Sequence, residues 1–249
     1  MISSVERYSS SAGKKRTNLF VGRLVRIVIT ALVLYLLVTR ALASTYRIAS
    51  VSMEPALSPA DRVIVSELAF GPRVPFSAAR LPGLQVPQRG DLVVVQPPLL
   101  GGPTIAVRIF EPLVRFFTLQ KVSLHRDLYG SRVPLSMVKR VIGLPGDSIR
   151  LKGFVASIKP RGASDFVPEQ QLIRTHYVLQ AKNRAPGWSD SLPLAGNGTE
   201  ILLRAGEYFV LGDNRPDSSD SRSWGPVGME RIVGKVIYRY WPPIALGKL

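Results

Sequence analysis

The chain has 249 residues, with 33 Lys and Arg against 17 Asp and Glu, which gives a formal net charge of +16. Hydrophobic residues make up 46% of it, which excludes a disordered polyelectrolyte and leaves room for one large or two small domains. With no cysteine and only two histidines, a disulfide framework, a thiol nucleophile and Cys- or His-rich metal sites are excluded. The positive charge leaves nucleic acid, an anionic membrane surface and simple solubility open.

The N-terminus combines positive charge with an apolar run. Residues 1–26 have a net charge of +5, and residues 27–39 (IVITALVLYLLVT) then continue for 13 positions without a charge. A spanning helix needs about 20 residues, and flanking apolar residues with snorkelling Arg26 and Arg40 extend the run to that length. A cleavable signal peptide ending at Ala41-Leu42-Ala43 fits equally well. A buried core helix is the third alternative.

Both of the first two interpretations place the basic N-terminus in the cytoplasm and send the rest of the chain across the membrane. We expect a cytoplasmic tail at 1–22, a single transmembrane anchor at 23–43 and an extracytoplasmic domain at 44–249. The predicted localisation is the plasma (inner) membrane.

Short β-branched segments bounded by Gly and Pro predict a mainly β domain after the anchor. Two polar or Pro-rich stretches, 70–90 and 153–198, are predicted to leave the sheet, the second as a small, loop-rich inserted cap. Residues 109–120 fit a short amphipathic helix. The expected strands, in chain order, are 46–51, 62–66, 91–96, 137–144, 148–152, 175–180, 207–211 and 232–240.

Several short motif matches fail on context. His125-Arg126-Asp127 begins like a kinase catalytic loop but lacks the following Asn and any glycine-rich loop. The aspartates at 213, 217 and 220 lack the other ligands of a calcium loop. Neither histidine lies in a setting that suits a Ser-His-Asp triad. We therefore expect no metal and no cofactor.

Four longer blocks remain, spaced in order through the β domain. The first follows a strand and ends in a Pro-marked turn, the second is a turn into a strand, the third is a strand running into a tight turn, and the fourth is a loop dense in Ser, Asp and Arg. They read SVSMEPAL at 50–57, RGDLVVV at 89–95, KRVIGLPGD at 139–147, and GDNRPDSSDSRSWG at 212–225.

Together, and behind an N-terminal anchor, these blocks resemble the boxes of the type I signal peptidases, the membrane-anchored Ser-Lys proteases that remove signal peptides. The resemblance covers the anchor and most of residues 46–241, while the stretches 70–90 and 153–198 carry no family motif. It implies a β-rich catalytic domain and preproteins that carry signal peptides as substrates. Ala56 and Asp217 depart from the family pattern, which has Thr and often Asn there.

The resemblance implies a role for each matching residue. Ser52 would be the nucleophile and Lys139 the general base. The hydroxyl of Ser50 would join the backbone N–H of Ser52 in an oxyanion hole. The lysine would be oriented by Ser218, and Asp220 and Arg222 would form a supporting ion pair.

A serine-lysine pair is chemically sufficient only if the lysine is neutral. The reference pKa of a lysine is about 10.4, so neutrality near pH 7 to 8 requires desolvation of roughly 3 to 4 kcal/mol. Apolar neighbours such as Met53, Val138, Val141 and Ile142 can supply it, while Arg140 should point to the other face of the strand. Such a site needs no His, Cys or metal.

Substrate is expected to bind as an added strand, with its small side chains one and three residues before the cut (A-x-A) in shallow pockets. Val51, Met53, Ala56 and Ile142 are the candidate pocket residues. The anchor ends only a few residues before Ser52, which would hold the site near the bilayer. Phe116 with Phe117, or Trp241 with the prolines after it, are candidate lipid contacts.

Two other functions are open at this point. A self-cleaving Ser-Lys repressor would share the dyad and use the charge on DNA, but it predicts a helix-turn-helix where the apolar run lies. A secreted, non-enzymatic β-domain binding protein would use 41–43 as its cleavage site. Residues 108–184 hold 14 Lys and Arg against 5 Asp and Glu, and on the far side of the membrane this charge suits anionic lipid rather than nucleic acid.

Overall fold

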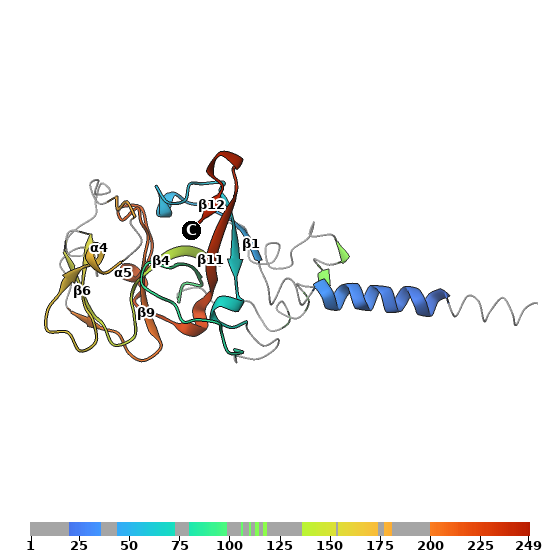
Figure 1. Ribbon diagram of the computed structural model, residues 1–249, viewed down its shortest axis with the longest axis horizontal. Helices are drawn as coiled ribbons and strands as arrows, with labels where there is room; N and C mark the ends of the chain where they lie inside the picture. The colour runs from blue at the N-terminus through green and yellow to red at the C-terminus, as the bar shows by residue number, and fades with distance from the viewer. Residues whose placement is uncertain are drawn as a thin grey trace, which may run out of the picture.

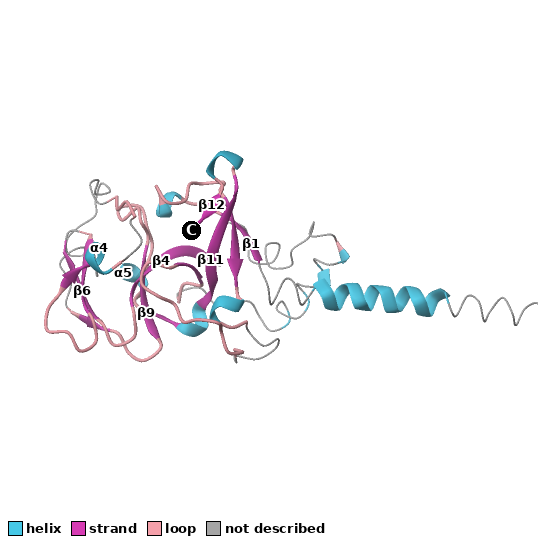
Figure 2. Ribbon diagram, in the orientation of Figure 1, coloured by secondary structure: helices cyan, strands magenta, loops and turns pink. Residues whose placement is uncertain are grey.

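The structure is a computed structural model in which β-strands dominate (Figure 2). The predicted mainly β class is thus confirmed. The structure describes residues 20–35, 44–72, 80–98, 136–152, 154–173, 177–180 and 200–249, and the positions 106, 110, 113, 114, 117 and 118.

The larger sheet is antiparallel and has eight strands, of which Figure 1 labels β1, β4, β9, β11 and β12 near the label C. β12 pairs with β11 beside the main path, and bulges interrupt β11 and the end of β4. The bulges bend the sheet, since an extra residue on one strand increases its local twist. The strand order is β1 (Ser44–Arg47), β2 (Arg62–Ser66), β11 (Ile232–Trp241), β3 (Leu92–Val95), β4 (Met137–Gly143), β9 (Glu207–Leu211) and β10 (Val227–Gly228), with β12 at Gly247–Lys248.

A smaller four-stranded sheet lies on the left of Figure 1 and carries a one-turn helix, α4 (Glu169–Leu172). The chain enters it from β4 through a tight turn at Gly146, whose φ of +90° favours glycine. The strand order is β7 (Val167–Pro168), β6 (Val155–Lys159), β5 (Ser148–Lys152) and β8 (Ile201–Leu202).

Three apolar clusters hold these sheets together. One packs Met53 and Leu57 against β2, β3 and β11, and another packs β3, β4 and β9 against Phe70. The third combines Ile142 and Phe209 from the larger sheet with β5 and β6 of the smaller one. The smaller sheet is therefore anchored on β4 and β9 by hydrophobic burial.

Most strand predictions are confirmed to within one or two residues, and those at 62–66, 148–152 and 207–211 match the observed bounds. The prediction of a strand over 46–51 is wrong at its end: β1 stops at Arg47 and a 3₁₀ helix spans Val51–Met53. The chain turns there because the N–H of Glu54 bonds to the carbonyl of Val51 and that of Leu57 to Met53.

The strand expected at 175–180 is also not formed by its described residues. Gln180 makes an isolated parallel bridge to Asn214, and residues 174–176 lie outside the described part of the chain. The stretch 70–90 leaves the sheet at Leu81, Leu84 and Val86, which are exposed, but Phe70 is buried in the core.

At the N-terminus, residues 20–35 form a helix that projects away from the sheets (Figure 1). Within the described residues, no helix is both long enough and apolar enough to span a membrane. The rest of the predicted anchor and the alternative cleavage site at 41–43 lie outside the described part, as does most of the predicted helix 109–120.

Candidate active site

Ser52 lies in the middle of the 3₁₀ helix that follows β1. The helix begins after Ser50, whose side chain does not cap it; instead the Ser50 hydroxyl lies 3.1 Å from that of Ser52. The backbone N–H and side-chain amide of Asn214 bond to the carbonyls of Ser52 and Val51, at 3.1 and 3.3 Å. The turn that carries Ser52 is thus tied to the loop after β9.

Lys139 comes from β4 and meets Ser52 although 87 residues separate them in the sequence. Its Nζ lies 2.9 Å from Ser52 Oγ and 3.1 Å from Ser218 Oγ. Ser52 is 6% exposed and Lys139 1%. The structure therefore brings together the predicted nucleophile, the predicted base and the serine expected to orient the lysine.

The loop after β9 supplies a second set of contacts behind Lys139. Asp220 accepts a hydrogen bond from Ser218 Oγ at 2.7 Å and is held by Arg222 in an ion pair of 2.8 Å. Asp220 also caps the short helix α5 (Ser221–Trp224). Both partners of the predicted ion pair are buried.

Burial lowers the pKa of the Lys139 amine from 10.5 to about 8, because the charged form loses its hydration. Asp220, Asp213 and Asp217 raise the pKa by attraction, and Arg222 lowers it. Arg222 also holds the pKa of Asp220 below its usual value, against the opposing effect of burial. The Arg222 guanidinium therefore neutralises most of the Asp220 carboxylate, so that Asp220 stabilises the charged form of Lys139 only in part.

Gly212 packs closely against Ser218 and Ser52, the two residues whose hydroxyls contact Lys139. Its N–H donates to Asp220 at 3.0 Å, and a Cβ at this position would collide with Ser218 Oγ and the carbonyl oxygen of Ser52. Only glycine permits the loop to approach both residues this closely.

Several residues that shape the site had no predicted role. Arg140 bonds to Asp213 through two hydrogen bonds of 2.8 and 2.7 Å, away from the contacts of Lys139, as its position on the strand predicts. Arg215 forms a fully buried ion pair with Glu169 of the smaller sheet, at 2.7 Å. Asn214 and Arg215 stand in the quoted block GDNR, but no motif signals Glu169.

A cavity of about 330 Å³ opens beside the turn that carries Ser52. Of the four predicted pocket residues, Ala56 lines this cavity, whereas the half-buried Val51, Met53 and Ile142 do not. Met53 and Ile142 are nearly fully buried, Met53 in the apolar cluster with Leu57 and Ile142 against the smaller sheet, and their place in the substrate pockets stays a prediction. The lining residues are Pro55, Ala56, Leu92, Arg140, Tyr177, Val178, Lys248 and Leu249.

Comparison with known families identifies the family of the chain. A family model described as signal peptidase, peptidase S26, matches residues 21–241, which is most of the chain. The chain belongs to this family. The predicted family and the prediction of a serine peptidase of the signal peptidase I type are confirmed.

Curated relatives support the assignment over most of the sequence. A probable signal peptidase I-1 of Synechocystis is 25% identical over 92% of this chain and 87% of its own length. Thylakoidal processing peptidase 1 of Arabidopsis thaliana is 26% identical over 86% of this chain. The chain spans 46%, about half, of that protein's length.

A crystal structure of a signal peptidase I from Enterococcus faecalis also matches, with 20% identity, 61% of this chain and 97% of that chain covered, and a TM-score of 0.30. The superposition is partial at that score, so membership of the family rests on sequence.

The lowered pKa of Lys139 predicts how stability depends on pH. Between pH 8 and 10.5 the unfolded chain holds a proton on this lysine that the folded chain has lost, so the free energy of unfolding should rise with pH by up to about 1.4 kcal/mol per pH unit. Urea unfolding of the wild type and Lys139→Met in mild detergent should show this slope in their difference.

Lys152→Met, which removes an exposed lysine from β5, controls for the loss of one positive charge. A difference between wild type and Lys139→Met that stays flat from pH 8 to 10.5 would show that the amine is not desolvated.

Proposed function

We propose that the chain is a membrane-tethered signal peptidase I, in which Ser52 is the nucleophile and Lys139 the general base. The enzyme removes N-terminal signal peptides from exported preproteins by cutting after small residues (A-x-A). The observation that carries the proposal is the 2.9 Å contact between Lys139 Nζ and Ser52 Oγ, both buried.

The reaction begins with proton transfer from Ser52 Oγ to the neutral Lys139 amine. With a pKa of about 8, about half of the amines are neutral at pH 8. Ser52 Oγ attacks the scissile carbonyl carbon, and the protonated lysine then gives its proton to the leaving amine, which breaks the peptide bond. In the second half Lys139 takes a proton from a water molecule, whose oxygen attacks the ester carbonyl carbon. The bond between this carbon and Ser52 Oγ then breaks, and Lys139 returns the proton to Ser52 Oγ.

The negative oxygen of the tetrahedral intermediate requires donors beside Ser52. The N–H of Ser52 lies in the first turn of the 3₁₀ helix, where backbone N–H groups have no acceptor within the helix. The Ser50 hydroxyl is close by and makes no cap, so both groups can donate to the oxyanion. One such donor typically contributes about 3 kcal/mol to the transition state.

An open strand edge provides a place for the substrate backbone. β4 pairs with β3 over residues 137–140, but it meets β9 only from Arg140 onward. Residues 137–139 therefore present one edge with no strand partner among the described residues, and this edge leads to Lys139. A preprotein segment that adds to it as a strand brings its peptide bond to the dyad.

The apolar N-terminal run supplies the tether. With residues 1–22 in the cytoplasm and 23–43 as a single-pass anchor of the plasma (inner) membrane, the catalytic domain at 44–249 lies on the extracytoplasmic side, with 153–198 as its inserted cap. The net charge of +5 in residues 1–26 sets this orientation.

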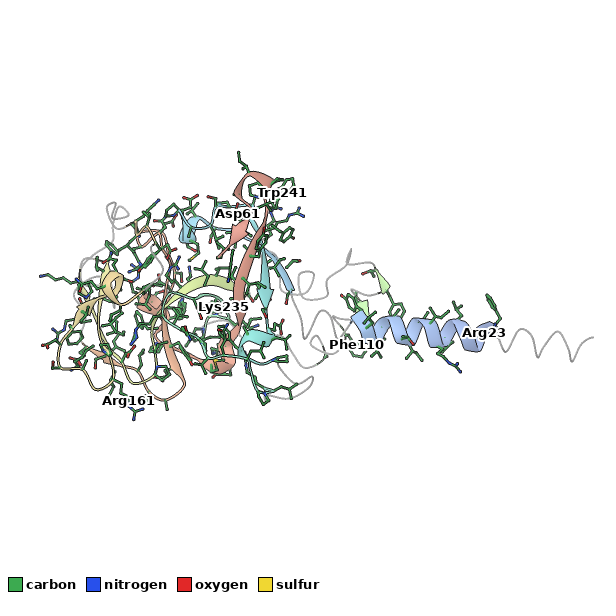
Figure 3. The ribbon with its side chains drawn as sticks, viewed as in Figure 1. Arg23, Asp61, Phe110, Arg161, Lys235 and Trp241 are labelled. Carbon is green, nitrogen blue, oxygen red and sulfur yellow. The ribbon has the colours of Figure 1, made fainter. Side chains whose placement is uncertain are left out.

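A second contact with lipid is made by the connection between β11 and β12. Trp241 at the end of β11, Ile244 in a 3₁₀ helix at Pro243–Ala245 and Leu246 directly after it are exposed, by 49%, 97% and 53%. Arg239 braces this end of the strand by bonding to Asp61, whose chain neighbour Arg62 pairs with Trp241 (Figure 3 labels Asp61 and Trp241). Exposed apolar side chains on a short braced turn suit insertion among headgroups. Phe117, which is 65% exposed, stays a candidate for the same role, while Phe116 lies outside the described residues.

The alternative functions have no comparable support. Membership of the signal peptidase family, over residues 21–241, argues against a DNA-binding repressor and a non-enzymatic binding protein.

Removal of either member of the dyad should abolish cleavage. We expect Ser52→Ala and Lys139→Ala to leave a preprotein with an A-x-A site uncut while the domain stays folded. Ser219→Ala, which changes an exposed serine next to Ser218 in the loop after β9, should keep wild-type turnover. Wild-type-like cleavage by either dyad variant would refute the assignment.

The absence of cysteine makes the lipid contact easy to test. A fluorophore on Ile244→Cys, in the full chain reconstituted in vesicles, should shift its emission to the blue and be quenched by lipids that carry a bromine or nitroxide near the headgroup. The same label on Arg161→Cys, an exposed position of the smaller sheet seen at the lower left of Figure 3, should not. Equal quenching at both sites would exclude a specific contact.

A further inference from the structure

A buried ion pair joins the smaller sheet to the loop that holds Lys139. Glu169, the first residue of α4, and Arg215 are both 0% exposed. Two parallel hydrogen bonds of 2.8 and 2.7 Å connect the guanidinium to the carboxylate. A fully buried ion pair is costly to desolvate and often no more stabilising than apolar packing, so its presence calls for a role beyond stability.

The carboxylate of Glu169 is fixed from several sides, by the smaller sheet and by Tyr177 as well as by Arg215. It also accepts hydrogen bonds from the N–H of Ala156 at 3.0 Å and from the hydroxyl of Tyr177 at 2.8 Å. Burial and the nearby carboxylate raise the pKa of that phenol, so it stays a donor. Four donors thus hold Glu169 in one position.

Arg215 passes this fixed position on to the active-site loop. Its Nε donates to the carbonyl of Gly212 at 2.7 Å, and its own carbonyl accepts a bond from Arg222 at 2.7 Å. Gly212 in turn donates to Asp220, which holds Ser218 and through it the Lys139 amine. Each step is a hydrogen bond between buried groups, where displacement is costly.

We propose that Glu169 is a positioning residue for Lys139, which acts through Arg215 and Gly212 to hold Asp220 and Ser218 against the amine. This role rests on the proposed function of Lys139 as the general base. The smaller sheet then serves as a clamp on the catalytic loop, although it contributes no group to the dyad. The alternative is that the ion pair only secures the fold of the insert.

The groups around the Lys139 amine determine how its pKa would change if the loop after β9 loosened. They are Ser52 and Ser218 in contact with it, and the charges of Asp220, Arg222, Asp213 and Asp217 around it. Without the Glu169 clamp, the loop relaxes and water reaches the amine. Its pKa then rises toward 10.5, since burial is the main cause of its low value.

The test is the kinetics of Glu169→Gln on a preprotein across pH 6.5 to 10.5, at a temperature where circular dichroism shows the variant folded. We expect kcat to fall about tenfold to a hundredfold, as small misplacements of catalytic groups do, with KM within about twofold. The acidic limb of kcat/KM should move from near pH 8 to higher pH. Glu200→Gln, which removes an exposed carboxylate paired with Arg150 and Lys159 beside the same sheet, is the matched control and should behave as wild type.

If Glu169→Gln does not fold, Arg215→Lys carries the test. It keeps a positive charge opposite Glu169, but an ammonium cannot make the two parallel bonds to the carboxylate and hold the Gly212 carbonyl as well. The same loss of kcat and the same shift of the acidic limb are expected. An unchanged kcat and an unchanged limb in a folded variant would overturn the proposal.

Cleavage by the wild type and the pH dependence of unfolding together separate a failure of this proposal from a failure of the proposed function. If the wild type shows no cleavage that depends on Ser52, the function is wrong. The pKa of Lys139 can still be read without catalysis, from the pH dependence of unfolding of Glu169→Gln against the double variant with Lys139→Met. A pKa that stays near 8 there would refute the positioning role by itself.

Discussion

Burial of one amine is the constraint on which the rest of the site depends. As the proposed general base, Lys139 can take a proton from Ser52 only when it is neutral, and about half of the amines are neutral at pH 8 because the fold removes them from water. That removal requires an apolar surround and a matched carboxylate, since an unpaired Asp220 beside the amine would hold the proton on it. Arg222, which pairs with Asp220 and lowers the pKa of Lys139, therefore helps to keep the amine neutral.

The two sheets divide the work of meeting this constraint. The larger sheet supplies Lys139 on β4 and ends its pairing with β9 next to that residue, which leaves the open edge that the proposed function assigns to substrate. The smaller sheet packs on β4 and β9 through a shared apolar core and reaches the catalytic loop through Glu169 and Arg215. Glu169, which lies within the predicted insert 153–198, is thus connected to the site, although no family motif falls within that stretch.

Two kinds of feature could be predicted from the sequence: strands with a clear local pattern, and site residues within the four ordered blocks. Strands such as 62–66 and 207–211 follow from short β-branched runs between turns, and the dyad partners follow from the blocks around Ser52 and Lys139. The 3₁₀ turn at Val51–Met53 was missed because the chain leaves β1 through local hydrogen bonds that β-branched residues do not signal. Glu169 was out of reach, because its partner lies 46 residues away and only the packed fold joins them.

A direct titration of the Lys139 amine tests whether burial in the folded protein lowers its pKa. The ¹³Cε resonances of lysine-labelled protein, with Lys139 assigned by its loss in Lys139→Met, report the protonation of each amine as pH rises. Burial of the amine predicts a midpoint near pH 8 for Lys139. A midpoint near 10.5, the ordinary value for a lysine, would mean that the folded protein holds a charged amine beside Ser52 and would contradict the account.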